Sequence, residues 1–241
     1  YHNINIIADS IYASFNGQHA GTAASGGVDS FYTILSYINA FSEESNKNID
    51  TLCFFNVGSH GSGQKGHELF LKRSGISNEI ANFLNLKYLQ VDTNLDDIYG
   101  KIDFIATHTF RTLSVVMLLQ KYFKVYYFSS GFEASEFKFD GKHLAYSELY
   151  LLPNISTDSL SLISVGAEAS RIEKVKFISS FEVCQKFLNV CVLSEHNCSK
   201  CFKCKRTMLD LYLNGVLDKY SSVFDVEYFC SISRWWFWLC Y

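Results

Sequence analysis

The sequence has little proline and a small net charge, and it lacks a long apolar run. One proline in 241 residues excludes a proline-rich linker between domains. The longest uninterrupted apolar run covers residues 235–241, which is too short to span a bilayer. A formal net charge of −3 provides no basic field of the kind that nucleic-acid-binding proteins carry. We therefore expect neither a membrane span nor a nucleic-acid partner.

What the chain does contain is typical of a folded globular protein. Hydrophobic residues make up 48% of it and aromatic residues 16%, and a chain of this length can form one substantial core, or one domain plus a small appendage. No signal peptide opens the sequence, and three of its eight cysteines lie within residues 198–204. We therefore expect a reducing, cytoplasmic compartment with metal-bound cysteines rather than disulfides. The chain begins with Tyr1 rather than Met, so an upstream segment can be missing.

Short apolar runs alternate with segments of helical period. The runs predict strands at residues 20–25, 51–57, 87–91, 124–129 and 160–165. The periodic segments predict helices at residues 28–41, 67–85, 105–122, just after 166 and from 207 to about 214. Strands separated by helices indicate an α/β fold, Rossmann-like, with a parallel five-stranded sheet and helices on both faces. We expect residues 1–182 to form this domain, with residues 183–241 as a C-terminal helical segment packed on it.

A glycine-rich stretch, Ser25-Gly26-Gly27-Val28-Asp29-Ser30, joins the first expected strand to the first expected helix. We call residues 25–30 the glycine loop. This layout directs backbone N–H groups and the positive end of a helix dipole at an anion, and glycines let the backbone approach phosphate oxygens closely. The Lys-Ser/Thr ending of the Walker P-loop is absent. Asp29 either caps the helix, as in an ordinary Gly-Ser turn, or holds Mg²⁺.

The six residues match the SGGxDS signature of the PP-loop ATP pyrophosphatases, and the chain resembles that family. The resemblance implies that the β- and γ-phosphates of ATP bind in the loop, and that cleavage between the α- and β-phosphates adenylates an oxygen nucleophile. Its implied nucleotide contacts are Ser25, Gly26, Gly27, Val28, Asp29 and Ser30, of which Asp29 and Ser30 also serve catalysis.

Ligands of parallel sheets bind beyond the carboxyl ends of the strands. This rule places the glycine loop, residues 57–63 and residues 129–131 along one rim, so we add Val57, on the adenosine side as in the family, and Gly131 to the nucleotide site.

Other candidates near this rim have two interpretations each. His60 fits a residue of a connecting loop better than a catalytic residue. Arg111, one turn after His108, either reaches a phosphate or carboxylate or ends in solvent. The aromatic segment 131–157 either caps an acceptor pocket or is an ordinary helical insertion.

Basic residues stand at the start of the helix after the last expected strand, in Ala169-Ser170-Arg171-Ile172-Glu173-Lys174. PP-loop proteins commonly carry a basic residue there, aimed at the phosphates, and either Arg171 or Lys174 matches that position. We choose Lys174 as the stronger catalytic candidate, because positive charge is needed where the departing pyrophosphate gathers charge. The alternative is an amphipathic helix with Glu173 and Lys174 in solvent.

Four cysteines near the C-terminus have metal-ligand spacing: Cys191, Cys198, Cys201 and Cys204. Their thiolates suit a closed, structural Zn²⁺ site, and the nearby Lys200, Lys203, Lys205 and Arg206 would offset its surplus negative charge. The alternatives are an iron–sulfur cluster, replacement of Cys191 by Cys184, or four unrelated buried thiols. We expect the remaining cysteines, Cys53, Cys230 and Cys240, to be core residues.

The glycine loop followed late in the chain by these cysteines resembles the 7-cyano-7-deazaguanine synthase family. The resemblance implies a ligase that uses ATP and Mg²⁺ to adenylate a carboxylate-like acceptor, releases pyrophosphate and transfers ammonia or an amine. Its partners are thus a small-molecule acceptor and an amine donor. The synthases carry a Tyr-Pro-Asp-Cys-Arg run after the fourth strand, where this chain has Ser129-Ser130-Gly131-Phe132-Glu133-Ala134-Ser135.

Three further alternatives stay open at this point. One keeps the loop but transfers sulfur to a nucleotide or small molecule, and another is a non-catalytic nucleotide-binding module. The third concerns the aromatic tail at residues 234–239, which either packs on the domain or forms a contact with a partner or a second copy, as in a homo-oligomer.

Overall fold

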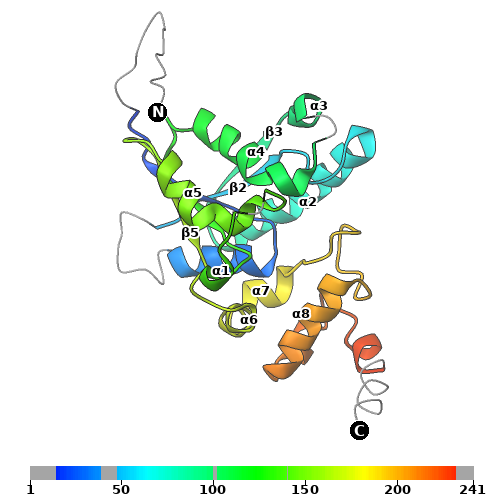
Figure 1. Ribbon diagram of the computed structural model, residues 1–241. Coiled ribbons are helices and arrows are strands. Elements are labelled where there is room, and N and C mark those ends of the chain that lie inside the picture. The colour runs from blue at the N-terminus through cyan, green and yellow to red at the C-terminus, as the bar shows by residue number, and fades with distance from the viewer. Residues whose placement is uncertain (1–14, 39–47, 100–101, 140, 232–241) are drawn as a thin grey trace, which may run out of the picture.

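The computed structural model describes residues 15–38, 48–99, 102–139 and 141–231 (Figure 1). They form one five-stranded sheet in the order β3-β2-β1-β4-β5, and every neighbouring pair is parallel. The strands are β1 (His19–Ala23), β2 (Thr51–Asn56), β3 (Lys87–Asp92), β4 (Phe123–Ser129) and β5 (Ser161–Val165). The predicted parallel sheet is confirmed, and each strand end lies within two residues of its predicted place.

Side chains of the central strands are buried on both faces of the sheet. In β4, Val125 and Tyr127 belong to one apolar cluster, whereas Tyr126 and Phe128 belong to another. Successive side chains of a strand point to opposite faces, so a strand with two covered faces is apolar throughout. This accounts for the continuous apolar runs from which the strands were predicted.

Helices cover both faces of the sheet (Figure 1). The cluster on one face includes residues of α1 (Val28–Tyr37), α2 (Gly63–Phe83), α6 (Arg171–Ile178), α7 (Glu182–Phe187) and α8 (Phe202–Leu213). The other face packs against α3 (Leu95–Tyr99), α4 (Phe104–Leu118) and α5 (Glu148–Ile155). The chain leaves β1 toward the first face and β4 toward the second, so the topological switch point lies between these neighbouring strands.

Several helix boundaries differ from the prediction. The first helix ends at Tyr37 rather than at 41, the second begins at Gly63 rather than 67, the α4 helix ends at Leu118 rather than 122, and α8 begins at Phe202 rather than 207. The early start of α8 has a local cause, since the N-cap residue Cys201 accepts a hydrogen bond from the backbone N–H of Cys204. The helices α3 and α7 were not predicted individually, whereas α5 lies in the segment 131–157, for which a helical insertion was one of the two alternatives.

The segment after residue 182 shares its core with the sheet. Cys184, Met208 and Leu211 belong to the same apolar cluster as Phe31 of α1. Among the cysteines expected in the core, Cys53 is buried, but the prediction for Cys230 is wrong because its side chain is exposed. Its neighbour Phe229 occupies the inward position instead, and successive helix residues point about 100° apart. The remaining cysteine, Cys240, and the aromatic tail lie outside the described residues, as do most of residues 1–19 and the polar loop at 43–47.

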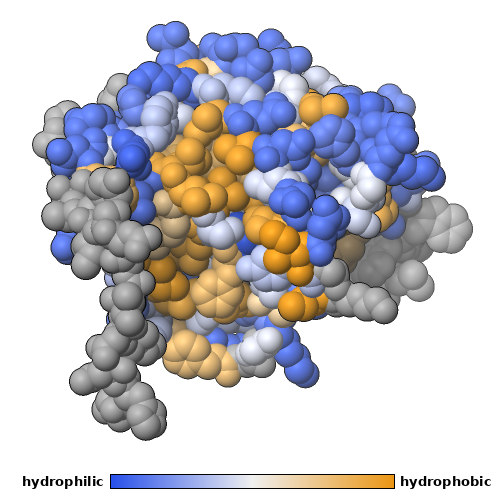
Figure 2. Space-filling model, turned by 90° about the horizontal axis from the view of Figure 1, so that it is seen from above, coloured by the Kyte–Doolittle hydropathy of each residue, from blue (hydrophilic) through white to orange (hydrophobic). Residues whose placement is uncertain are grey.

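Among the described residues, no helix combines the length and the apolar character needed to cross a membrane. Exposed apolar residues occur on α4 (Ile105, Phe110, Leu118) and α5 (Leu149, Tyr150). Figure 2, which views the molecule from above, shows apolar side chains gathered in the middle of that face.

Candidate functional site

The glycine loop lies at the carboxyl end of β1, next to the switch point. β1 ends at Ala23 and α1 begins at Val28, so the chain turns within four residues. Gly26 makes this turn possible with φ of +75°, in the left-handed region that disfavours residues with a Cβ. Its carbonyl accepts a hydrogen bond from the backbone N–H of Asn189 at 2.8 Å. The loop is therefore held from outside the strand and helix that it connects.

Two serines shape the loop from within. The hydroxyl of Ser30 donates to the carbonyl of Ala23 at 2.6 Å and accepts from the N–H of Ser25 at 3.2 Å, and Ser30 is buried. The exposed Ser25 accepts from the N–H of Gly27 through its hydroxyl at 3.3 Å. Ser30 thus fixes the shape of the loop, whereas Ser25 lies at its surface.

No side chain caps the start of α1. The N-cap residue is Gly27, which has no side chain to accept from the first-turn N–H groups, and Asp29 lies inside the first turn rather than at the cap. The alternative of an ordinary turn capped by Asp29 is therefore wrong. The N–H groups at such an uncapped helix start favour an anionic ligand.

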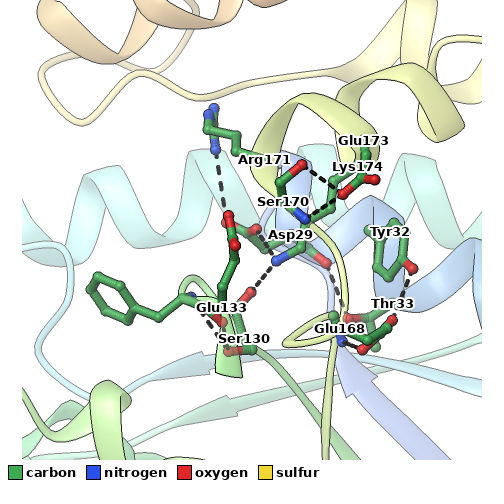
Figure 3. A network of polar contacts seen from close by, with 12 residues as sticks. Asp29, Tyr32, Thr33, Ser130, Glu133, Glu168, Ser170, Arg171, Glu173 and Lys174 are labelled. Atoms are coloured by element: carbon green, nitrogen blue, oxygen red, sulfur yellow. Dashed lines mark hydrogen bonds and ion pairs between the residues drawn. The ribbon is translucent and has the colours of Figure 1, made fainter. Parts of the chain in front are cut away.

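Asp29 and Lys174 form an ion pair across the switch point (Figure 3). The Lys174 Nζ donates to Asp29 Oδ1 at 3.0 Å and to the carbonyl of Ser130, just past β4, at 2.7 Å. Lys174 is 2% exposed, and Asp29 is partly exposed. Lys174 is thus not a solvent-facing residue of an amphipathic helix. The pair joins α1, the end of β4 and α6 at one point.

The segment between β5 and α6, residues 166–170, helps to position Lys174. Gly166 has φ of +94°, and a Cβ there would lie 3.1 Å from the Lys174 Nζ. Glu168 accepts from the N–H of Gly166 at 3.0 Å and from the Tyr32 hydroxyl at 2.8 Å. Burial, together with the bond to Glu168, raises the pKa of Tyr32 to about 12. Glu173 forms a capping box with Ser170, and these bonds lower the pKa of its carboxyl.

Arg171 lies on the other side of Asp29, at 4.0 Å from Oδ2, and Figure 3 shows both basic side chains near this carboxylate. Its guanidinium donates to Thr207 Oγ1 at 2.8 Å, and its Nε lies 3.3 Å from Asp210 Oδ2. Burial and the neighbouring Arg206 lower the pKa of Arg171. Both predicted basic residues therefore meet Asp29, and Arg171 also connects it to α8.

The other two predicted nucleotide contacts lie on the same rim. A Cβ added to Gly131 would lie 4.0 Å from Asp29 Oδ2, so this glycine borders the ion pair. Val57 follows β2, one strand away from β1, and is buried. Its carbonyl accepts from Arg111 Nη1 at 3.2 Å, so this oxygen is already engaged.

Arg111 and His60 are structural residues. Arg111 is 1% exposed and donates to Asp96 Oδ1 at 2.8 Å, to the carbonyl of Ile102 at 3.2 Å and to Thr107 Oγ1 at 2.9 Å. The alternatives of a phosphate ligand and a solvated helix end are therefore both wrong. The His60 ring packs near Phe54 and Phe70, and burial lowers the pKa of His60 to about 4.

An aromatic group lies in the segment after β4. Phe132 stacks on Tyr146 with ring centroids 3.8 Å apart, and His143 meets both rings edge-on. The ring of His108, from α4, lies 5.4 Å from that of His143, and burial lowers the pKa of His108 to about 4. Sequence reasoning found the aromatic richness of this segment but not these histidine partners.

A cavity of about 480 Å³ opens at the carboxyl ends of β2 and β3. Its lining includes Ser62 from the loop after β2, and Asn56, His67 and Asp92. Asp92 accepts from Asn56 Nδ2 at 2.7 Å and lies 3.4 Å from His67 Nδ1. Carboxylates and amides are available there to polar groups of a ligand on the same rim as the glycine loop.

The four predicted cysteines form one cluster, in which all four sulfur atoms lie within 4.8 Å of one another. We call Cys191, Cys198, Cys201 and Cys204 the cysteine cluster. Four Zn–S bonds of about 2.3 Å in a tetrahedron place sulfurs roughly 3.8 Å apart, so small shifts suffice to hold a metal ion. The predicted alternative ligand, Cys184, is buried in the core instead, and burial raises the pKa of its thiol.

Backbone groups support the cluster. The N–H of Cys201 donates to Cys198 Sγ at 3.3 Å, and that of Cys204 donates to Cys201 Sγ at 3.5 Å. Burial opposes ionisation of Cys191, but hydrogen bonds from Ser194 and backbone N–H groups lower its pKa to about 6. Arg73 of α2 donates to the carbonyls of Cys191 and Ser194 at 3.0 and 2.9 Å. The donor set of four thiols suits a soft cation such as Zn²⁺.

Comparisons of this chain with protein-family models, with curated proteins and with solved structures return no match.

Proposed function

We propose that this chain is an ATP-dependent adenylating enzyme of the PP-loop type. It would transfer the adenylyl group of ATP to a carboxylate-like acceptor, release pyrophosphate and pass the activated acyl group to ammonia or an amine. One observation carries the proposal: an uncapped, glycine-shaped helix start meets a buried lysine at the switch point of a parallel sheet. Such a place combines an anion site with positive charge beyond the carboxyl ends of the strands.

The β- and γ-phosphates would accept hydrogen bonds from the backbone N–H groups of the glycine loop. Gly27 carries no Cβ there and is partly exposed, so phosphate oxygens can come close to the backbone. The adenosine would extend along the rim toward the cavity beside β2 and β3, whose Asp92 and Asn56 suit ribose hydroxyls.

Lys174 and Arg171 would stabilise the charge that develops on pyrophosphate as it departs. Lys174 is buried and fixed by two acceptors, so its ammonium group is already in place before the reaction. Preorganised charge of this kind is a large contribution to catalysis because no reorientation is needed in the transition state. Arg171 provides a planar guanidinium suited to phosphate oxygens.

Asp29 would hold Mg²⁺ when nucleotide is bound. It is the carboxylate of the glycine loop, it is partly exposed, and carboxylate oxygen is a preferred ligand of this ion. Bound Mg²⁺ supplies neutralisation of phosphate charge. Asp29 would also keep the Lys174 ammonium group oriented toward the glycine loop, through the hydrogen bond that joins the two side chains.

The acceptor would bind under the segment that follows β4. Phe132, His143 and Tyr146 provide flat apolar surface, and the segment starts at Gly131 beside Asp29. The cysteine cluster would hold Zn²⁺ as a closed structural site, because four thiolates leave no coordination position for a substrate.

Product analysis with ATP labelled on the α-phosphate, and in a parallel reaction on the γ-phosphate, tests the proposal, because the first label follows AMP or ADP and the second follows pyrophosphate or inorganic phosphate. The protein is incubated with Mg²⁺, ammonium and a panel of small carboxylic acids, and the labelled products are separated. We expect AMP and pyrophosphate in equal amounts, with a rate at least 100-fold lower for Lys174→Met. The matched control is Lys176→Met, which removes an exposed lysine of the same helix and should leave the rate unchanged.

Other outcomes assign a different function. Release of ADP and inorganic phosphate would overturn the proposal. Nucleotide binding without any product across the panel would favour a non-catalytic nucleotide-binding module. A coloured iron–sulfur centre in place of colourless zinc would favour sulfur transfer.

A further inference from the structure

The inward face of α8 continues directly from the cysteine cluster. Cys201 is the N-cap of this helix and Cys204 lies in its first turn. Thr207 follows Cys204 by three residues and Asp210 follows Thr207 by three, so Thr207 neighbours both of the other residues on the helix surface. A metal ion held by the cluster therefore fixes the start of the helix from which Thr207 and Asp210 project.

These two side chains hold Arg171. Thr207 Oγ1 accepts from the Arg171 guanidinium at 2.8 Å, and Asp210 Oδ2 lies 3.3 Å from its Nε. Arg171 in turn lies 4.0 Å from Asp29 of the glycine loop. Thr207 is fully buried and Asp210 is largely buried, so water does not readily replace either partner.

A second connection reaches the loop through the backbone. The N–H of Asn189 donates to the carbonyl of Gly26 at 2.8 Å, and the side-chain oxygen of Asn189 accepts from the N–H of Cys191 at 3.2 Å. The cysteine cluster is thus connected to the glycine loop by two routes, one through Cys191 and Asn189 and the other through α8 and Arg171.

We propose that Thr207 and Asp210 are positioning residues that hold Arg171 toward the glycine loop, and that they couple nucleotide binding to metal binding in the cysteine cluster. This inference rests on the proposed function in one respect, namely that the glycine loop binds the phosphates of a nucleotide. The metal ion touches no substrate. It fixes α8, α8 fixes Arg171, and Arg171 completes the positive side of the phosphate site.

Coupling of this kind is reciprocal. If the metal raises the affinity for nucleotide by some factor, nucleotide raises the affinity for the metal by the same factor. Coupling between two sites in one protein typically amounts to about 5- to 150-fold. A merely structural zinc site, or a merely structural Asp210, would not make zinc affinity depend on nucleotide.

The test measures both affinities on the full chain. The probe nucleotide is α,β-methylene-ATP with excess Mg²⁺, which is not cleaved between its α- and β-phosphates. Its Kd is measured on zinc-loaded and on metal-free protein, and the zinc affinity is measured by chelator competition with and without the nucleotide. We expect at least a 5-fold tighter nucleotide Kd with zinc, and an equal factor in the zinc affinity.

Variants test the coupling on zinc-loaded protein, so the result does not depend on whether the metal-free protein stays folded. Asp210→Asn and Thr207→Val, both zinc-loaded, should weaken nucleotide binding at least 5-fold and abolish most of the nucleotide effect on zinc affinity. Zinc affinity measured without nucleotide should stay within about 2-fold of wild type, because neither residue is a metal ligand. The matched control is Asp218→Asn, an exposed aspartate after α8, which should behave as wild type.

The two proposals fail in different ways. If zinc-loaded wild type binds no nucleotide, the proposed function fails and the coupling fails with it. If wild type binds nucleotide but Asp210→Asn binds it equally well, and zinc affinity is the same with and without nucleotide, only the coupling is overturned.

Discussion

Replacing Glu148 by glutamine should stabilise the protein above neutral pH and leave its stability in acid nearly unchanged. Glu148 is 4% exposed at the start of α5, and its Oε1 accepts from Thr109 Oγ1 at 2.5 Å. Burial raises the pKa of its carboxyl to about 7, although the bond from Thr109 opposes this. The folded protein therefore favours the neutral form of this side chain.

The size and the sign of the effect follow from linkage. The difference between an ordinary pKa of 4.5 and about 7 corresponds to about 3 kcal/mol. Between these two pH values the folded state keeps a proton that the unfolded state has lost. Stability from this group therefore falls as pH rises from about 4.5 to about 7, and the loss is complete above that range. Glutamine stays neutral at every pH, so Glu148→Gln should gain up to about 3 kcal/mol at pH 8 and close to nothing at pH 4.5.

Urea unfolding followed by circular dichroism at several values between pH 4.5 and 8 measures this difference. Contributions of other groups, such as His108, are common to variant and wild type and cancel in the comparison. The matched control is Glu227→Gln, an exposed glutamate whose replacement should change stability little at any pH. A stability difference between Glu148→Gln and wild type that does not grow with pH would show that burial does not raise the pKa of the Glu148 carboxyl.

Three further predictions concern the residues that shape the site. Arg111→Met should destabilise the protein by about 3 kcal/mol in urea unfolding, because it leaves a buried carbonyl and a carboxylate without their donor; a loss below about 1 kcal/mol would contradict this. Gly26→Ala should weaken nucleotide binding at least 10-fold and cost about 1–2 kcal/mol of stability through its left-handed backbone, whereas Gly75→Ala, with open space around a helical glycine, should do neither. Cys201→Ser should lower bound zinc well below one per chain by elemental analysis, whereas the exposed Cys230 can be replaced by serine without loss of zinc.

Local sequence signals were enough to predict the sheet, the cysteine cluster and the basic residues beside the glycine loop. The strands carry apolar side chains on both faces, so their runs are visible without knowledge of neighbours. The cysteine cluster needs four thiols whose spacing is visible in the sequence, and the structure brings these four together. The basic residues after β5 were predicted to face the glycine loop, and Lys174 and Arg171 both lie beside Asp29.

What could not be predicted depends on contacts between distant parts of the chain. Arg111 is buried because acceptors from three other segments surround it, and no local pattern marks such a position. The contacts of Asp210 with Arg171 and of Asn189 with Gly26 could not be predicted either, because Asp210 and Asn189 come from segments after residue 182 that no local pattern places beside the glycine loop. The α5 helix contains Pro153, the single proline of the chain, and proline within a helix argues against one on sequence grounds. The α3 helix has only five residues and none of them is buried, so it is too short for a helical period to be detected.

Titration of the zinc-loaded protein with α,β-methylene-ATP and excess Mg²⁺, followed by displacement with pyrophosphate or AMP, tests the central claim most directly. We expect one nucleotide per chain, displacement by pyrophosphate at a concentration at least 10-fold lower than by AMP, and loss of binding in Gly26→Val. Absence of binding, or binding that Gly26→Val leaves intact and AMP displaces as well as pyrophosphate, would contradict the claim that the glycine loop holds the two outer phosphates.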